Sequence, residues 1–326
     1  MASDVRLRAR HVPADVQMFN RPWLALFDRR KPVREVEIPP ILAALDDNTV
    51  AEIASRLGPR WFARLAVTCV AFRDFVTSRE DVWRGFCLDA FAHRETARET
   101  HERCRKVHRG CWRTMFRERL RLRCDGLYVS RNTYIKPGAK TLENAKSCHL
   151  VVYYRFFRFF STGEFVCKTS PKKLREEAKL LRDQAALARV NDGEVFHGWY
   201  SIEGNDRVHC EVIRPASDGT MSSTHFWVRL RGTKPGASNR LDVVKIAMVD
   251  EGSNPPTPDE EEWIAIDDEE HLYRRGLGIS AQKFDGTAPV RVANRGMNTL
   301  VFVPWEDVNA HEINKGVDEM DFYYTG

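Results

Sequence analysis

The sequence predicts an α+β protein in which a series of short helices precedes an antiparallel β-barrel or sandwich with one helical insertion. Two patterns support this prediction. Apolar residues recur at helical spacing between residues 45 and 123, and short β-branched and aromatic runs separated by turns follow from residue 125. Apolar residues make up 43% of the 326 residues, which is enough for a packed core, and charged residues make up 30%.

These patterns divide the chain into four segments. Residues 1–44 are charged, aperiodic and interrupted by prolines, so we expect a flexible N-terminal arm. We expect a helical domain at residues 45–92, an arginine-rich helical connector at residues 93–124, and an antiparallel β domain at residues 125–326.

Three short helices are predicted within the helical domain, each with apolar residues three and four positions apart. The first should start at Thr49, because Thr49 and Glu52 have the spacing of a capping box. The second should run over residues 59–72, with its proline in the first turn. The third should start at Ser78.

Most of the β domain reads as short strands. Residues 149–160 and 165–167 flank the turn at 161–163 and predict a β-hairpin. We expect one helix at residues 174–187 and a long solvated loop at the proline-rich, acidic residues 251–262. The further strand candidates are residues 195–202, 208–213, 226–231, 241–249, 263–266 and 299–303.

The cysteines and the absence of long apolar runs suggest a compartment. Eight cysteines are scattered over residues 69–210 without a Cys-X-X-Cys pair, and the chain opens on charged residues instead of an apolar signal segment. No run approaches the roughly 20 apolar residues that cross a bilayer. We therefore expect free thiols, no membrane partner and a cytoplasmic location, with the nucleus left open as a second one.

Patterns of known catalytic chemistry are missing. We find no phosphate-binding glycine loop, nucleophile elbow or metalloprotease helix. His101, Cys104, His108 and Cys111 are zinc-ligand types, but on one straight helix they would span about 15 Å. Zinc ligands must converge within about 2.3 Å of one ion. We therefore predict no catalytic, cofactor or metal site, and a protein that is not an enzyme.

Three strings in the helical domain resemble the F-box, a helical module that docks on a Skp adaptor. They are residues 45–59 (LDDNTVAEIASRLGP), 65–72 (LAVTCVAF) and 81–84 (DVWR). Asp46 departs from the usual pattern, which has proline after the first leucine. The resemblance implies a Skp adaptor as partner and, through it, a cullin scaffold. The adaptor-binding positions carried over from the pattern are Leu45, Ile53, Leu57, Leu65, Val67, Cys69, Phe72 and Trp83.

Strings further along the chain resemble the F-box only protein 9 family, including its fungal relatives. They are residues 112–130 (WRTMFRERLRLRCDGLYVS), 132–135 (NTYI) and 152–160 (VYYRFFRFF). This resemblance implies the substrate-recognition subunit of an SCF-type cullin-RING E3 ubiquitin ligase, a non-catalytic adaptor in protein ubiquitination and proteasomal degradation. It implies no cofactor and leaves the substrate-binding residues unknown.

Three alternatives remain open at this point. The helices could be a cap that packs only on its own protein. The β domain could be a lipocalin-like barrel that carries or senses a small apolar ligand. The arginine-rich residues 94–123 could bind RNA, although a net charge of +5 does not by itself favour nucleic acid as a partner.

Substrate specificity is expected in the β domain. A protein partner typically needs about 800 Å² on each side, and recognition residues usually lie on loops. The candidate loops are residues 130–142, 234–239 and 251–262. Arg155 and Arg158 alternate with aromatic residues, which suits stacking, pairing with acidic side chains of the same domain, or a substrate groove.

Overall fold

The chain forms two compact units in the computed structural model. The helical unit consists of Met1–Leu88 and Cys104–Arg113, and the barrel unit of Asp89–Arg103 and Thr114–Gly326. The residues that the structure describes are 44–140, 146–183, 187, 195–204, 206–215, 221–264, 289–293 and 296–316. The expected N-terminal arm, residues 1–44, therefore lies outside the described residues except for Ala44.

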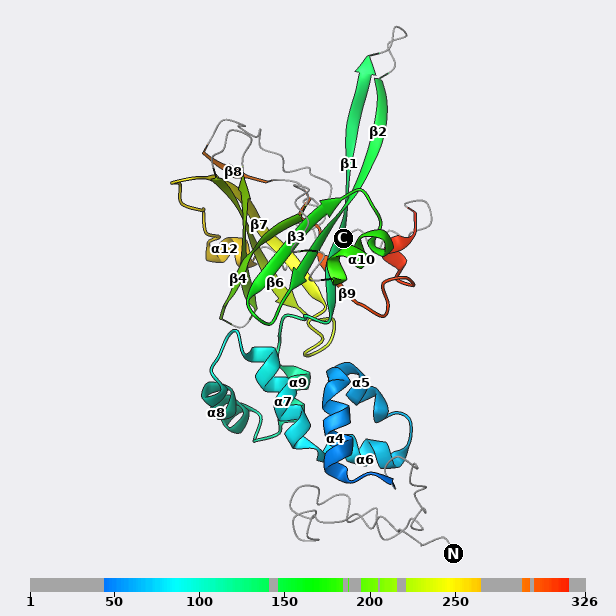
Figure 1. Cartoon of the computed structure of the whole chain (residues 1–326). Helices are drawn as coiled ribbons and strands as arrows, with labels where there is room; N and C mark the ends of the chain where they lie inside the picture. Colours follow the sequence, from blue (N-terminus) through cyan, green and yellow to red (C-terminus); the bar gives the residue numbers. More distant parts are fainter. Residues whose placement is uncertain are drawn as a thin grey trace, which may run out of the picture. The chain divides into compact units, whose positions relative to one another are not determined.

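The helices of the first part of the chain are short, as predicted (Figure 1). Short helices gain most of their stability by burying an apolar stripe against neighbours. They are α4 (Asp47–Arg56), α5 (Gly58–Leu65), α6 (Val70–Ser78), α7 (Glu80–Phe91), α8 (Ala97–Val107) and α9 (Trp112–Glu118).

The predicted helix at residues 59–72 is two helices in the structure. Helix α5 ends at Leu65, whose carbonyl accepts hydrogen bonds from the backbone N–H and the hydroxyl of Thr68. Cys69 then takes an extended conformation, and its Sγ accepts a hydrogen bond from the backbone N–H of Phe72 at 3.5 Å. These local hydrogen bonds compete with the helical pattern, so α6 begins as a new helix.

The segment at residues 101–111 is not one helix either, so the four potential zinc ligands do not lie on one straight helix as we expected. Helix α8 ends at Val107, and the chain turns at Arg109 and Gly110, whose φ angles are 53° and 78°. Positive φ values terminate a right-handed helix. Among the described residues, no group of three or more histidine, cysteine, aspartate or glutamate side chains is placed to hold a metal ion.

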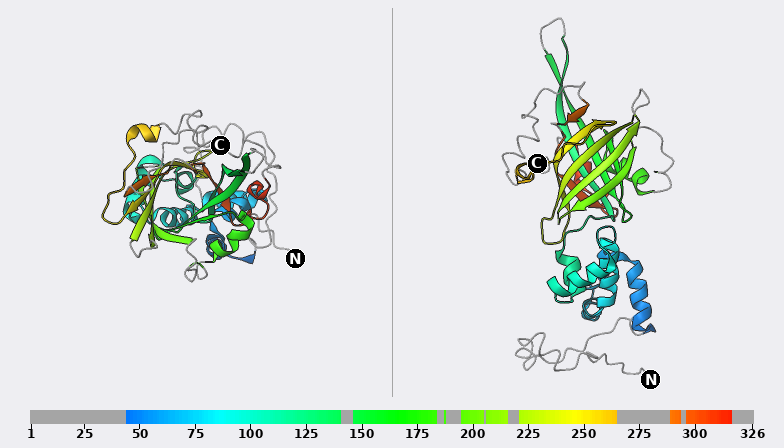
Figure 2. Two further views of the ribbon diagram at one scale, coloured as in Figure 1. Left: turned by 90° about the horizontal axis from the view of Figure 1, so that it is seen from above. Right: turned by 90° about the vertical axis from the view of Figure 1, so that its left-hand side faces the viewer.

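An eight-stranded antiparallel barrel forms the larger unit, which confirms the predicted α+β fold and selects barrel over sandwich. Neighbouring strands follow the order β6-β5-β4-β3-β2-β1-β9-β7, β7 pairs with β6 to close the sheet, and β8 is added to β7 (Figures 1 and 2). The strands are β1 (Gly126–Lys140), β2 (Lys146–Phe159), β3 (Glu164–Ser170), β4 (Val195–Glu203), β5 (Arg207–Pro215), β6 (Met221–Arg231), β7 (Arg240–Asp250), β8 (Val290–Val292) and β9 (Leu300–Pro304).

Aromatic side chains fill the middle of this barrel. Phe157 on β2 lies against Phe165 and Phe226, with ring centroids 4.9 and 5.0 Å away. Tyr128 packs on Phe302 at 4.9 Å between centroids. An eight-stranded barrel has an interior just wide enough for such side chains. They occupy the space that an apolar ligand would need in the lipocalin-like alternative.

The outer face of β1, β2 and β3 forms a second apolar layer. Phe156 and Val166, which alternate with the inward residues, pack with Leu174 and Leu181 of α10 (Leu174–Arg182). Period-two alternation therefore gives these strands one face toward the barrel interior and one toward a covering helix. This arrangement confirms the predicted hairpin and helical insertion.

One predicted strand, residues 263–266, is wrong, because residues Glu260–Ile264 form helix α12. The backbone N–H of Glu262 donates to Asp259 Oδ1 at 2.8 Å, and the backbone N–H of Asp259 donates to Glu262 Oε2 at 3.1 Å. This reciprocal cap starts a helix at a site where apolar content alone suggested a strand.

The candidate loop at residues 130–142 is also wrong over the part that the structure describes. Strand β1 continues to Lys140 and pairs with β2 along its length, whereas β9 accompanies it only as far as Val129. Strand β2 stays paired with β3 as far as Tyr154, which lies opposite Arg131. Beyond these two residues β1 and β2 form a two-stranded ribbon that extends past the end of the barrel (Figure 1).

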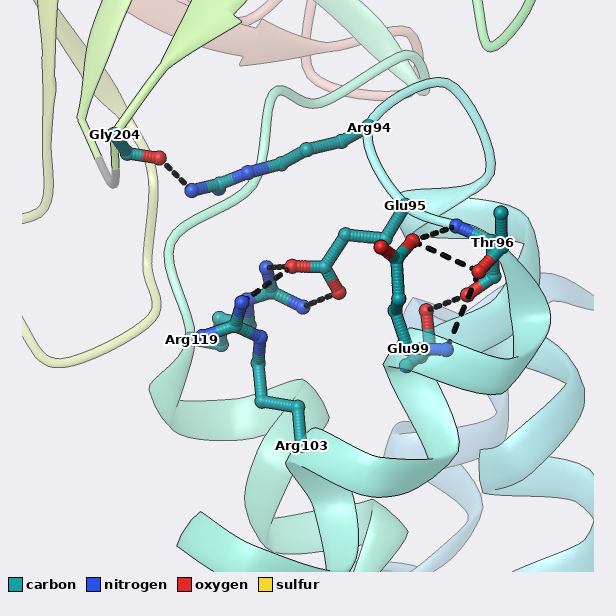
Figure 3. A network of polar contacts seen from close by, with 8 residues as sticks. Arg94, Glu95, Thr96, Glu99, Arg103, Arg119 and Gly204 are labelled. Atoms are coloured by element: carbon teal, nitrogen blue, oxygen red, sulfur yellow. Dashed lines mark hydrogen bonds and ion pairs between the residues drawn. The ribbon is translucent and has the colours of Figure 1, made fainter.

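Glu95 joins the arginine-rich segment into the barrel unit (Figure 3). Its carboxylate binds Arg119 and Arg103, each with an N–O distance of 2.9 Å. Arg94 donates to the backbone carbonyl of Gly204 in the β4–β5 turn. Although burial raises the pKa of Glu95, the hydrogen bonds and charges of Arg119 and Arg103 hold it below its usual value.

A buried ion pair fixes α10 on β3. Lys168 Nζ lies 3.1 Å from Glu177 Oε2, and both side chains are only 4% exposed. The Ser170 hydroxyl donates to the other carboxylate oxygen at 2.7 Å. Both oxygens of Glu177 thus have partners, as a buried charge requires.

We predict that Glu177→Ala lowers the free energy of unfolding by about 3–5 kcal/mol, because it leaves the Lys168 charge buried without this carboxylate. Urea denaturation of the full chain, followed by circular dichroism, would measure the change. Glu176→Ala, on the exposed neighbouring position of α10, is the matched control. Equal losses in the two variants would contradict the prediction.

Candidate functional site

Exposed apolar side chains are concentrated at the start of the helical unit. They lie on α4, on α5 and around the turn to α6, and one of them, Val67, is 81% exposed. Concentrated exposed apolar residues usually mark a binding surface. We call this set the apolar face; it consists of Leu45, Ile53, Leu57, Trp61, Val67 and Val70.

Helix α4 has two apolar stripes, one buried and one exposed. Val50 and Ala54 are buried, whereas Ile53 and Leu57, one turn apart, are exposed. Since residues four apart lie on one side of a helix, Ile53 and Leu57 form a single stripe. The stripe turns away from the core of the unit.

The start of α4 is set by Asp46, not by Thr49 as we predicted. Asp46 Oδ2 accepts hydrogen bonds from the backbone N–H groups of Asn48 and Thr49, each at 3.1 Å. The Thr49 hydroxyl, which donates to Asp46 Oδ1, and these backbone bonds hold the pKa of Asp46 below its usual value. The residue that departs from the F-box pattern therefore has a local role as the N-cap of the helix.

The core of the helical unit is a cluster of aromatic rings centred on Phe62. The rings of Trp83 and Phe86 lie 5.3 and 5.8 Å from it, and that of Phe75 lies at 6.3 Å. Trp83 is 5% exposed, and its Nε1–H donates to the Val76 carbonyl at 2.9 Å. Trp83 thus lies in the core of the helical unit, and its assignment to the adaptor-binding positions stays a prediction.

The structure distributes the other carried-over positions between two groups. Leu45, Ile53, Leu57 and Val67 are exposed and belong to the apolar face, whereas Leu65, Cys69 and Phe72 are half-buried beside it.

Trp61 is a member of the apolar face that the sequence interpretation missed. It follows Ile53 and Leu57 at a further four-residue step, but Gly58 and Pro59 break the helix between them and hid this spacing. The guanidinium of Arg64 lies 4.7 Å from the centre of the Trp61 ring. Such stacking leaves the ring edge open to a partner while holding its orientation.

Basic side chains surround the apolar face. Arg56, Arg64 and Arg73 are exposed, and Arg60 is half-buried. One of them has an acidic neighbour close by, since Glu52 Oε1 lies 2.9 Å from Arg56 Nη2. An apolar centre with a basic margin suits a partner of acidic margin, since complementary charge favours encounter and fixes register.

The candidate recognition loop at residues 234–239 is a structural contact. Ser238 is buried, its hydroxyl accepts from the backbone N–H of Arg121 at 3.0 Å, and its carbonyl accepts from Tyr128 at 2.7 Å. A Cβ on Gly236 would lie 1.7 Å from the Arg117 carbonyl, so only glycine fits. This loop therefore holds the connector to the barrel.

Residues 251–262 keep the solvated, acidic character that we predicted for most of their length. Glu251, Asp259 and Glu261 are exposed there. Glu260 is exposed as well and pairs with Arg207 at 2.6 Å. Residues 260–262, the end of this range, belong to α12 and not to the loop.

Many arginines of residues 94–123 are engaged within the barrel unit, which weakens the RNA-binding alternative. Besides the Glu95 network, Arg121 stacks on Phe116 at 3.8 Å, and Arg123 stacks on Phe302 at 3.9 Å. Arginines held in this way present less of their charge to phosphates.

Two further findings concern the described residues as a whole. All of their cysteines whose side chains are described carry free thiols. In the same part of the chain, no helix combines the length and the apolar character needed to cross a bilayer.

Comparisons with known proteins identify similar sequences. Residues 101–326 match the family model described as the F-box only protein C-terminal region. The chain is 27% identical over 104 residues to F-box protein pof7 of Schizosaccharomyces pombe, which is 31% of this chain and 28% of that protein. It is 33% identical over 63 residues to F-box protein HRT3 of Saccharomyces cerevisiae, which is 18% of each chain. These matches span less than a third of either relative, and no solved structure matches the chain.

We predict that Trp83→Phe lowers the free energy of unfolding of the helical unit by about 1–3 kcal/mol, because the buried Val76 carbonyl loses its donor. Thermal and urea unfolding of the full chain would measure the loss. The same substitution at the exposed Trp61 is the control and should change stability little. A larger loss of stability in Trp61→Phe than in Trp83→Phe would contradict the assignment of Trp83 to the core.

Proposed function

Because this chain belongs to the F-box protein family, we propose that it is the substrate-recognition subunit of an SCF-type cullin-RING ubiquitin ligase. The observation that carries this proposal is the apolar face on a helical unit whose own aromatic core is already complete. Its position, residues 45–70, coincides with the strings that resemble the F-box. The resemblance of residues 112–130, 132–135 and 152–160 to the F-box only protein 9 family makes that subfamily our preferred assignment.

A Skp adaptor is the partner that we assign to the apolar face. Ile53, Leu57 and Trp61 would be the apolar anchors, since large side chains at the centre of an interface contribute most of its binding energy. The basic margin would then meet acidic residues of the adaptor. A cullin scaffold would bind the adaptor and not this chain.

Catalysis in this proposal depends on position alone. An E2 enzyme brought by the scaffold would transfer ubiquitin, while this chain holds the substrate nearby and raises its effective concentration. We accordingly propose a non-enzymatic adaptor without a cofactor. Its free cysteines fit the reducing cytoplasm or nucleus, where we expect this protein to act and to direct its substrates to proteasomal degradation.

The barrel unit is our candidate for substrate recognition. The apolar face would be covered by the adaptor, so a protein substrate needing about 800 Å² must bind elsewhere. Two features of the barrel unit offer such a surface. They are the β1–β2 ribbon and the acidic residues at 251–262, which suit a basic partner.

We predict that Ile53→Asp combined with Leu57→Asp reduces affinity for a Skp adaptor at least a hundredfold. Burying unpaired carboxylates costs several kcal/mol, and about 1.4 kcal/mol corresponds to a tenfold change. Co-purification and calorimetry with a purified adaptor would measure the loss.

Val107→Asp places one new carboxylate on an exposed apolar position of α8, away from the apolar face, and should bind normally. Circular dichroism would confirm that each variant folds. A folded double variant with unchanged affinity would remove the adaptor assignment.

We also predict that replacing residues 125–326 by the corresponding region of a relative transfers that relative's substrates and leaves adaptor binding unchanged. The exchanged region should keep a glycine at position 236 and a serine at position 238, because these two residues hold the connector. Affinity purification with mass spectrometry would identify the bound substrates. Substrates that instead follow residues 1–44 would make the N-terminal arm the receptor.

A further inference from the structure

We propose that one end of the barrel is a binding site for a small oxyanion, formed by Arg155 of β2 and Arg214 of β5. This proposal does not depend on the role in ubiquitin transfer. It rests on where these two cations lie and on the partners that they have.

Arg155 points into the barrel. It occupies the same face of β2 as Phe157 and Phe159, which belong to the interior cluster. Its guanidinium carbon lies 5.7 Å from the centre of the Phe226 ring, also an interior residue, and its Nη1 donates to the Gly296 carbonyl.

Arg214 points into the barrel from β5, which β3 and β4 separate from β2. Val212 and Cys210 precede it on the inward face of β5 and belong to the interior cluster. Its guanidinium carbon lies 3.8 Å from the centre of the Phe196 ring, which packs against that cluster. Its Nε is fully buried and has no hydrogen-bond partner.

The two arginines share one environment. Both of their charges act on the thiol of Cys167, although burial is the larger effect and raises the pKa of this thiol to about 11. Burial and the positive charge of Arg155 lower the pKa of Arg214. An anion bound between two buried guanidinium groups would stabilise the charged form of both.

No carboxylate among the described residues forms an ion pair with either arginine. The recorded partners of Arg155 are a backbone carbonyl and an aromatic ring, and those of Arg214 are an aromatic ring and nearby charges. Elsewhere in the barrel unit, arginines such as Arg119, Arg207 and Arg291 do pair with carboxylates. Arg155 and Arg214 are thus left with charge for an external anion.

An exposed residue adjoins Arg155 on the inward face of the sheet. Thr169, which follows Phe165 and Cys167 on the inward face of β3 and pairs with Arg155, is exposed. Gly296 lies against Arg155, because a Cβ on Gly296 would lie 3.3 Å from Arg155 Nη2. The aromatic side chains of the barrel interior fill the space on the inner side of the two arginines. This geometry favours a ligand of few atoms over a polypeptide segment.

Guanidinium groups recognise phosphate and carboxylate through paired hydrogen bonds, with a planar fork that lysine lacks. A small dianion would engage both arginines at once. Inorganic phosphate is therefore the first probe, and succinate tests whether two linked carboxylates serve as well.

The experiment is calorimetric titration of the full chain with inorganic phosphate at constant ionic strength, supported by thermal melting in the same buffers. We expect saturable binding to the unmodified chain. Arg214→Gln should weaken it at least tenfold. Arg207→Gln, which removes the same charge from an outward position of the same strand, should bind as the unmodified chain does.

Arg214→Lys retains the charge but not the fork, and it should also weaken binding if the glutamine variant does not fold. Absence of saturable binding would overturn the proposal, as would unchanged affinity in both Arg214 variants or an equal loss in Arg207→Gln. Binding of a blocked acidic peptide without binding of phosphate or succinate would overturn the assignment of a small ligand.

Discussion

Closure of the barrel is the constraint on which most of the described structure depends. Once β6 pairs with β7, every strand has one face toward a closed interior that only side chains can fill. Aromatic rings on alternate residues meet that demand, with Phe157 in contact with both Phe165 and Phe226. The opposite residues of β1 to β3 then need a cover, which α10 supplies through Leu174 and Leu181.

The helical unit meets its packing demand in another way. Its helices are too short to be stable singly, and they gather Phe62, Phe75, Trp83 and Phe86 into one aromatic core. That core uses one apolar stripe of α4 and leaves a second, which carries Ile53 and Leu57, exposed. The division of one short helix into an inner and an outer apolar stripe is what makes the helical unit suited to a partner.

Arginine takes three different parts in the barrel unit, and its surroundings decide which. Arg119 is buried against the carboxylate of Glu95 and holds the connector (Figure 3). Arg158 donates to the Leu181 carbonyl and stacks on Phe160 at 4.2 Å, so it fastens α10 through a backbone oxygen. Arg155 and Arg214 lie inside the barrel, and in the described part of the chain no carboxylate forms an ion pair with either. A buried arginine whose charge is paired within the protein stabilises the fold, whereas a buried arginine without a carboxylate can bind an anionic ligand.

The sequence by itself determined the α+β class, the β-hairpin and helix α10, because each depends on periodicity over a few residues. Only the tertiary structure decided that the sheet closes, that Trp83 is core while Trp61 is surface, and that residues 234–239 are a buried contact. The helix at residues 260–264 was missed for a more local reason, since two reciprocal hydrogen bonds outweighed apolar content. Periodicity shows that a face is apolar, but the partner that covers this face comes from a distant part of the chain or from another molecule. Local spacing carries no information about that partner.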